Sequence, residues 1–150
     1  MEFDQLKLEN QICFPLYAVS RLIIREYQEL LGKLEITYPQ YLVLMVLWET
    51  DNISVNDISQ RLILNTNTVT PLLKRMEVLG IITRNHSAKD ERKVMVKLTE
   101  KGLLMRAKAS GIPEKLFACI VSDALKAEDL IDMKEKLNVL INHLSQNKTE

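Results

Sequence analysis

Two cysteines are the residues of this chain best suited to redox chemistry. Cys13 lies beside Phe14 and Tyr17, and Cys119 lies in the apolar segment 116–120. A cysteine that senses an oxidant needs thiolate character, some exposure and room for the oxidant, and its first oxidation product is a sulfenic acid. A buried cysteine instead behaves as a small hydrophobic residue. Because both cysteines have apolar neighbours, position alone leaves a reactive and a structural role open.

Composition limits the class of protein. The 150 residues are 47% hydrophobic, and 20 basic residues balance 20 acidic ones, which fits one compact domain and excludes a disordered chain. Four glycines and four prolines are too few for a glycine-rich phosphate-binding fold or a turn-dense β-barrel. No apolar run approaches the roughly 18–20 residues of a membrane span, and residues 1–11 do not resemble a secretory signal. We therefore expect a cytoplasmic protein with reduced thiols and no membrane partner.

Positive charge is concentrated in the middle third of the chain. Residues 56–101 contain nine Lys and Arg against five Asp and Glu, whereas residues 1–55 contain four against eight. Such an asymmetry fits a nucleic-acid-binding surface, and it also fits an ordinary solvated surface. The order of the structural elements around the basic segment has to decide between them.

The spacing of apolar residues predicts a mainly helical fold with a small β-hairpin. Helices are expected over about 6–34, 38–48, 55–62, 66–79, 99–109 and 113–146, the last interrupted near Ser122 and Asp123. Ser54 and Asp57 have the spacing of a capping box at the start of the third helix. Two β-rich segments, 81–84 and 94–98, flank a polar loop and predict a two-stranded hairpin.

A short helix, a turn, a second helix and a hairpin, in this order, are typical of a winged helix-turn-helix that binds DNA. Small polar residues open the second helix and can approach phosphates and base edges, and cations follow on that helix and on the hairpin. The candidate DNA-binding residues are Thr66, Asn67, Thr68, Thr70, Lys74, Arg75, Arg84, Lys89, Arg92 and Lys93. The alternative is a surface helix with hydroxyl caps and a hairpin that only packs.

Several motifs resemble one family. Segment 90–99 (DERKVMVKLT) resembles the wing signature of the MarR family of bacterial regulators, and 72–77 (LLKRME) with 80–84 (GIITR) resembles its recognition helix and first wing strand. Segments 8–14 (LENQICF), 36–41 (ITYPQY) and 47–49 (LWE) are similar to the organic hydroperoxide sensor (OhrR-like) branch. The resemblance covers about residues 6–120. It implies a single domain over 1–150, with dimerisation helices in 1–36 and 112–150 and a winged helix-turn-helix in 37–110.

The resemblance also implies a function. It indicates a homodimeric repressor that binds a pseudo-palindromic operator on double-stranded DNA and releases it when an organic hydroperoxide oxidises Cys13. In the sensor branch two tyrosines hydrogen-bond the reactive thiolate. Tyr27 and Tyr38 stand at the matching positions here, and Tyr17 is a further nearby candidate. In the family an aspartate orients the wing arginine that enters the minor groove, and Asp90 and Arg92 match that pair.

Helix geometry constrains the sensor. Tyr27 lies 14 residues after Cys13, which is about 21 Å along a continuous helix. A tyrosine side chain cannot span that distance. A contact between them therefore requires either a break in the helix or a second subunit. We expect the second subunit, with the two first helices antiparallel across a twofold axis.

Cys119 is the candidate for the second redox step. Some sensors of the branch resolve the sulfenic acid with a C-terminal cysteine of the partner, and others use a low-molecular-weight thiol. Cys119 falls near the expected position of the resolving residue. A disulfide needs Cα atoms about 4.4–6.8 Å apart. If the reduced protein holds the two cysteines further apart, oxidation has to move helices.

Two other functions remain open from the sequence. One is a MarR-type repressor whose small-molecule effector binds between the dimerisation and DNA-binding regions, with Cys13 structural. The other is a thiol peroxidase that uses Cys13. His86 and His143 are far apart and neither pairs with a cysteine at metal-ligand spacing, so we expect no enzyme, metal or cofactor. Asn85 and His86 stand where the sensor branch is expected to have a more basic run. DNA affinity is therefore expected to depend more on Arg84 and Arg92.

Overall fold

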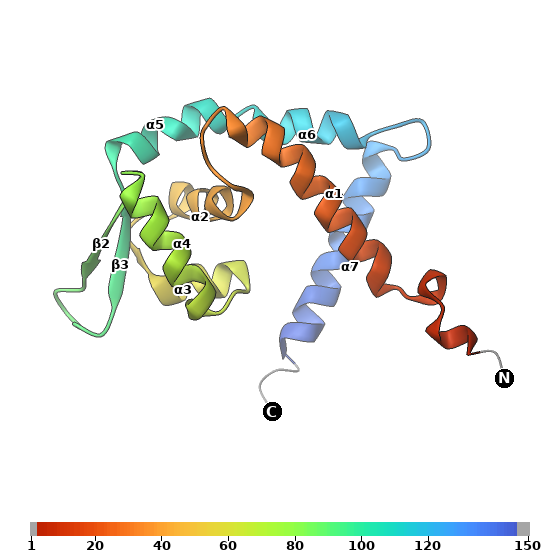
Figure 1. The fold of residues 1–150 in the computed structure, drawn as a ribbon, viewed down its shortest axis with the longest axis horizontal. Helices are drawn as coiled ribbons and strands as arrows, with labels where there is room; N and C mark the ends of the chain where they lie inside the picture. Colours follow the sequence, from red (N-terminus) through yellow and green to blue (C-terminus); the bar gives the residue numbers. More distant parts are fainter. Residues whose placement is uncertain (1–2, 147–150) are drawn as a thin grey trace. The chain divides into compact units, whose positions relative to one another are not determined.

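The structure is a computed structural model that describes residues 3–146. The chain divides into two compact units, the first ending at Ser110 and the second beginning at Gly111. The first unit begins with the 3-10 turns η1 (Asp4–Leu6) and η2 (Leu8–Asn10). Its helices are α1 (Cys13–Gly32), α2 (Tyr38–Glu49), α3 (Val55–Leu62), α4 (Thr66–Val78) and α5 (Glu100–Ala109) (Figure 1). Its strands are β1 (Ile53–Ser54), β2 (Ile82–His86) and β3 (Val94–Leu98). The second unit contains α6 (Ile112–Ile120) and α7 (Ala127–Gln146).

The helix-turn-helix consists of α3 and α4, and local signals set its limits. The Asp57 backbone N–H donates to Ser54 Oγ at 3.1 Å, and the Ser54 backbone N–H donates to the Asp57 carboxylate at 3.1 Å, so the predicted capping box is present. The Ser54 hydroxyl and backbone N–H hold the pKa of Asp57 below its usual value. Helix α3 ends at Leu62, and its C-cap residue Ile63, whose φ of 55° lies in the left-handed region, turns the chain toward α4.

A three-stranded antiparallel sheet forms the wing, with β3 in the centre and the order β1-β3-β2. Ile82 pairs with Leu98 and Arg84 with Val96, and Ile53 pairs with Val96 on the other side of β3. The sequence predicted only the β2–β3 hairpin. Strand β1 is two residues long and is defined by its pairing with β3, so it has no alternating pattern of its own. Figure 1 shows the hairpin extending beyond α3 and α4.

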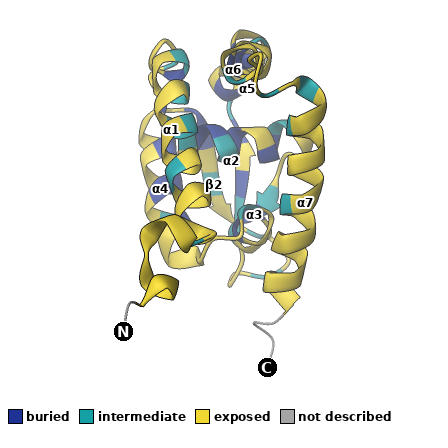
Figure 2. Ribbon diagram, turned by 90° about the vertical axis from the view of Figure 1, so that its right-hand side faces the viewer, coloured by how far each residue is buried: buried dark blue, intermediate teal, exposed yellow. Residues whose placement is uncertain are grey.

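The hydrophobic core of the first unit lies around α2. Leu44, Ile58, Leu73 and Val96 come from α2, α3, α4 and β3 and are all fully buried. Figure 2 shows buried residues gathered in α2, whereas α7 is exposed or half-buried along its length. No helix of residues 3–146 is long and apolar enough to span a membrane. The core therefore fixes the positions of α4 and the sheet, which carry the candidate DNA-binding residues.

Helix α1 begins later than the sequence indicated. The expectation of one helix from about residue 6 is wrong, because residues 4–10 form the turns η1 and η2 instead. The Asn10 side-chain amide donates to the Asp4 carbonyl at 2.8 Å, and the Gln11 side-chain amide donates to the Gln5 carbonyl at 2.6 Å. These side-chain bonds occupy backbone carbonyls that a helix would use. As a result Cys13 is the first residue of α1, and the helix continues without a break past Tyr27.

Candidate functional site

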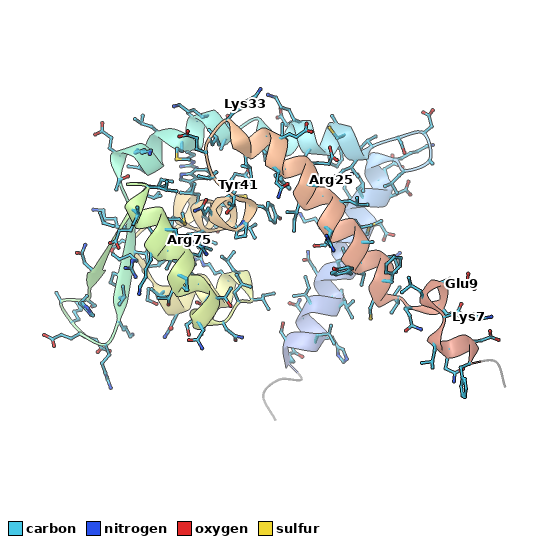
Figure 3. All side chains as sticks on the ribbon, in the orientation of Figure 1. Lys7, Glu9, Arg25, Lys33, Tyr41 and Arg75 are labelled. Atoms are coloured by element: carbon cyan, nitrogen blue, oxygen red, sulfur yellow. The ribbon has the colours of Figure 1, made fainter. Side chains whose placement is uncertain are left out.

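Helix α4 presents a polar face because its buried apolar residues lie on one side. Its buried residues follow helical spacing: Val69, Leu72, Leu73 and Met76. The residues at its start, Thr66, Asn67 and Thr68, are exposed, as are Lys74 and Arg75, and Thr70 is half-buried. Arg75 projects from α4 in Figure 3. The helix thus offers hydroxyl and amide groups at its N-terminal end and positive charge further along.

The tip of the wing holds an oriented arginine. The Asp90 carboxylate accepts hydrogen bonds from the backbone N–H and from Nε of Arg92, both at 3.1 Å. These two bonds hold the pKa of Asp90 below its usual value. The Arg92 side chain remains 92% exposed, and Lys89 is also exposed. The carboxylate therefore orients Arg92 and leaves most of its guanidinium free for a ligand.

Arg84 has a different environment from Arg92. Its Nη2 lies 2.9 Å and its Nε 3.1 Å from Glu77 Oε2, and its backbone N–H donates to Glu77 Oε1 at 3.1 Å. Only 19% of the Arg84 side chain is exposed. Because Glu77 compensates its charge, Arg84 is less available to phosphate than the sequence suggested. The pair joins the end of α4 to β2. Nearby, His86 Nδ1 lies 2.7 Å from the Glu91 carbonyl oxygen.

The Glu77–Arg84 pair predicts a measurable coupling. Glu77→Gln and Arg84→Gln should each lower the free energy of unfolding, and the double variant should lose less than the sum of the two. We expect a coupling energy of about 1 kcal/mol, since the pair is charge-assisted but partly solvated. Urea unfolding of the four proteins measures it. Strict additivity would show that the pair does not hold α4 to β2.

A small hollow of about 200 Å³ lies where α3, α4 and the wing meet. Its lining includes Val55, Asn56 and Val94 together with hydroxyl and cationic side chains, namely Ser54, Thr66, Thr70, Arg84, Arg92 and Lys93. Hydroxyl donors and guanidinium groups together suit an anion such as a phosphate. The hollow therefore brings together side chains from all three elements of the candidate DNA-binding surface.

A cluster of tyrosines forms where α1 meets α2. The rings of Tyr27 and Tyr38 are 4.6 Å apart between centroids, and those of Tyr27 and Tyr41 are 5.8 Å apart. Burial, with further contributions from Tyr38 and Tyr41, raises the pKa of Tyr27 to about 12. Burial also raises the pKa of Tyr38. At neutral pH these hydroxyls stay protonated and can donate hydrogen bonds.

Tyr41 is the last residue of the motif 36–41, but the sequence did not identify it as part of the site. It is 2% exposed and lies on α2, where Figure 3 labels it. Its spacing of three residues from Tyr38 places both rings near one face of the helix, and that spacing is the signal that could have identified it.

Cys13 does not join this cluster within one chain. It is exposed at the start of α1, and Tyr27 lies about 21 Å further along the same helix. Tyr17 is one turn after Cys13, where its hydroxyl accepts a hydrogen bond from Arg21 at 2.8 Å. Tyr17 is likewise separate from the Tyr27–Tyr38 pair. Cys119 is exposed on α6, in the second unit.

Both units expose apolar side chains. On α1 these are Phe14, Leu16, Val19 and Leu22, and on α7 they are Ile131, Met133, Val139, Leu140, Ile141 and Leu144. Exposed apolar side chains in such numbers on one helix are typical of a protein–protein interface. Within residues 3–146, no three His, Cys, Asp or Glu side chains are grouped so that they could hold a metal ion.

Comparisons with known proteins identify related chains. The family model described as transcriptional regulator SarA/Rot matches residues 25–107. The organic hydroperoxide resistance transcriptional regulator of Bacillus subtilis is 46% identical over 97% of each chain. AbfR is a protein of Staphylococcus epidermidis. The structure of reduced AbfR bound to DNA matches with a TM-score of 0.77 at 34% identity, and the match covers 96% of this chain and 99% of the AbfR chain. The disulfide form of AbfR has a TM-score of 0.64 at 34% identity and covers 95% of each chain.

Proposed function

The chain belongs to the SarA/Rot family of MarR-like winged-helix transcriptional regulators, and on that premise we propose a homodimeric repressor that releases operator DNA when an organic hydroperoxide oxidises Cys13. The relative from B. subtilis is named for organic hydroperoxide resistance, and AbfR is known both reduced on DNA and in a disulfide form. Such a repressor acts on chromosomal DNA in the cytoplasm. The observation that carries the proposal is the distance along α1 between the exposed Cys13 and the Tyr27–Tyr38 pair.

The sensor site is completed by a second subunit. Because α1 is unbroken, Tyr27 cannot reach Cys13 of its own chain. Two α1 helices that run antiparallel bring each Cys13 to the tyrosine pair of the partner. The midpoint between Cys13 and Tyr27 is Ser20, so this small residue lies at the twofold axis. The exposed apolar residues of α1 and α7 then form the dimer interface.

The tyrosine pair prepares the cysteine for oxidation. Two protonated hydroxyls that donate to a sulfur stabilise its thiolate form. The thiolate attacks the peroxide, one oxygen transfers to sulfur, and the alcohol leaves, so that the sulfur is oxidised by two electrons to a sulfenic acid. The sulfenic acid then condenses with a thiol, forms a disulfide and releases water. That thiol is Cys119 of the other subunit or a low-molecular-weight thiol.

DNA is bound through α4 and the wing. The exposed start of α4 enters the major groove, where Thr66, Asn67 and Thr68 meet base edges and phosphates. Lys74, Arg75 and Lys89 supply charge to the phosphate backbone, and Arg92, oriented by Asp90, extends from the wing into the adjacent minor groove. Oxidation favours a dimer arrangement in which the two α4 helices no longer fit successive major grooves, and the protein dissociates.

Mass analysis without reductant, paired with operator binding, tests the proposed function. The purified protein is measured before and after one equivalent of an organic hydroperoxide. A dimer linked through Cys13 and Cys119, with loss of operator binding, supports the two-cysteine mechanism. A Cys13 adduct without that link, again with loss of binding, supports a sensor that uses a small thiol. An unmodified Cys13, or operator binding unchanged by its oxidation, overturns the proposal and favours a regulator induced by a small-molecule effector.

A further inference from the structure

The one tryptophan of the chain connects α2 to α5 by a directional bond. The Trp48 indole N–H donates to the Gly102 carbonyl at 2.9 Å, across 54 residues of sequence. The ring of Trp48 meets Tyr41 edge-on, with centroids 6.1 Å apart. Because Tyr41 also contacts Tyr27, the rings form a series, which we call the aromatic series, through Tyr38, Tyr27, Tyr41 and Trp48. One end of the series is the tyrosine pair, and the other end is the first turn of α5.

The first turn of α5 is fixed to the segment that joins α4 to β2. The Thr99 backbone N–H donates to the Ile81 carbonyl at 3.0 Å, and Lys101 Nζ donates to the Leu79 carbonyl at 2.8 Å. Gly102 is packed so closely that a Cβ atom there would lie 2.3 Å from the Ile81 carbonyl oxygen. A shift of the Gly102 backbone toward Ile81 therefore displaces residues 79–81, and a shift away from it strains the two hydrogen bonds to that segment. Those residues directly follow the last turn of α4.

We propose that Trp48 is a positioning residue that couples the tyrosine pair to the recognition helix α4 through its hydrogen bond to Gly102. This inference rests on the proposed function, in which oxidation of Cys13 removes the hydrogen bonds that hold Tyr27 and Tyr38. Close-packed rings pass from one arrangement to another rather than deforming gradually. A new position of Tyr27 displaces Tyr41, Tyr41 displaces the indole of Trp48, and the indole carries the Gly102 carbonyl with it.

The indole N–H is what makes Trp48 suited to this role. An apolar contact between α2 and α5 allows sliding, whereas a hydrogen bond fixes both distance and direction. Trp48→Phe keeps an aromatic ring against Tyr41 and removes only the donor and the second ring. The matched control is Met45→Leu, a substitution of a more exposed apolar residue on the same helix.

Operator affinity of the reduced and oxidised proteins tests the coupling. In the wild type the ratio of the two affinities is expected to be about 5–150-fold, the usual size of such couplings. Trp48→Phe should oxidise at Cys13 at the wild-type rate, bind the operator when reduced, and show a ratio reduced to less than about twofold. Met45→Leu should keep the wild-type ratio. A wild-type ratio in Trp48→Phe overturns the inference and leaves the proposed function intact, whereas a ratio near one in the wild type overturns the proposed function itself.

Tryptophan fluorescence provides the second measurement, which does not depend on the folding of the variant. With one tryptophan in the chain, the emission of the wild-type protein reports on Trp48 alone. Oxidation by one equivalent of hydroperoxide should change its intensity and emission maximum, and Cys13→Ser should show no change. Unchanged emission in a wild-type protein that has lost operator binding overturns the inference.

Discussion

Cys13→Ser is expected to produce a repressor whose operator affinity no longer responds to organic hydroperoxide. A serine hydroxyl is close in size to the thiol but does not form a sulfenic acid, so the step that starts release is lost. Cys13 is exposed at the start of α1, and the substitution should leave the fold and the reduced-state affinity unchanged. Fluorescence anisotropy with labelled operator, with and without one equivalent of peroxide, should show an affinity loss of about 5–150-fold in the wild type and less than about twofold in the variant.

Cys119→Ser is the matched control for this result, since it removes the other exposed thiol of the described chain. If Cys119 resolves the sulfenic acid, this variant still oxidises at Cys13 but forms no link between subunits. If a small thiol performs that step, Cys119→Ser behaves as the wild type. Release of the operator by peroxide in Cys13→Ser would contradict the sensor role and would assign Cys13 a structural one.

The elements that the sequence predicted well carry their signals locally. The capping box of Ser54 and Asp57 marks the start of α3, and the predicted range 55–62 matches the observed helix. Thr99 accepts a hydrogen bond from the Gly102 backbone N–H and caps α5 close to the start predicted for that helix. A cap depends on residues three positions apart, so no knowledge of the tertiary structure is needed to recognise it.

The features that the sequence did not predict depend on distant or competing contacts. Strand β1 exists because it pairs with β3, more than forty residues later. The start of α1 depends on the side chains of Asn10 and Gln11, which donate to backbone carbonyls in η1. The Glu77–Arg84 pair appears only when α4 lies beside β2. Periodicity contains no information about such contacts, because it describes one element at a time.

The tyrosine site was predictable from the sequence only in part. The family motifs indicated Tyr27 and Tyr38, and the structure brings their rings together from two helices. From the sequence, a contact between Cys13 and Tyr27 required either a broken helix or a second subunit. The continuous α1 removes the broken helix. The bond from Trp48 to Gly102 was not accessible from the sequence, since it joins two helices across 54 residues that no shared motif or helical spacing connects.

Arg92→Ala is expected to weaken operator binding by about 5–150-fold, or about 1–3 kcal/mol, the usual cost of losing an arginine that contacts bases. Its side chain is almost fully exposed and is oriented by Asp90, so its removal should not affect the free energy of unfolding. Binding titrations at several salt concentrations measure the effect. They also show the kind of contact, because losing an arginine that contacts only a phosphate reduces the salt dependence of binding by about one counterion and weakens binding equally on all sequences.

Two controls separate orientation from charge. Arg106→Ala removes the same charge from an exposed position on α5, outside the surface formed by α4 and the wing. It should change affinity by less than about twofold, because salt screens an exposed charge that makes no contact with the DNA. Asp90→Asn weakens the acceptor that orients Arg92 and adds no bulk. The operator affinity of this variant should therefore lie between those of the wild type and Arg92→Ala. If Asp90→Asn instead binds more tightly than the wild type, removal of a negative charge outweighs orientation, and the Asp90–Arg92 bond is not what makes the wing effective. Equal affinities for Arg92→Ala and the wild type would exclude Arg92 from the interface and leave the charge on α4 to account for binding.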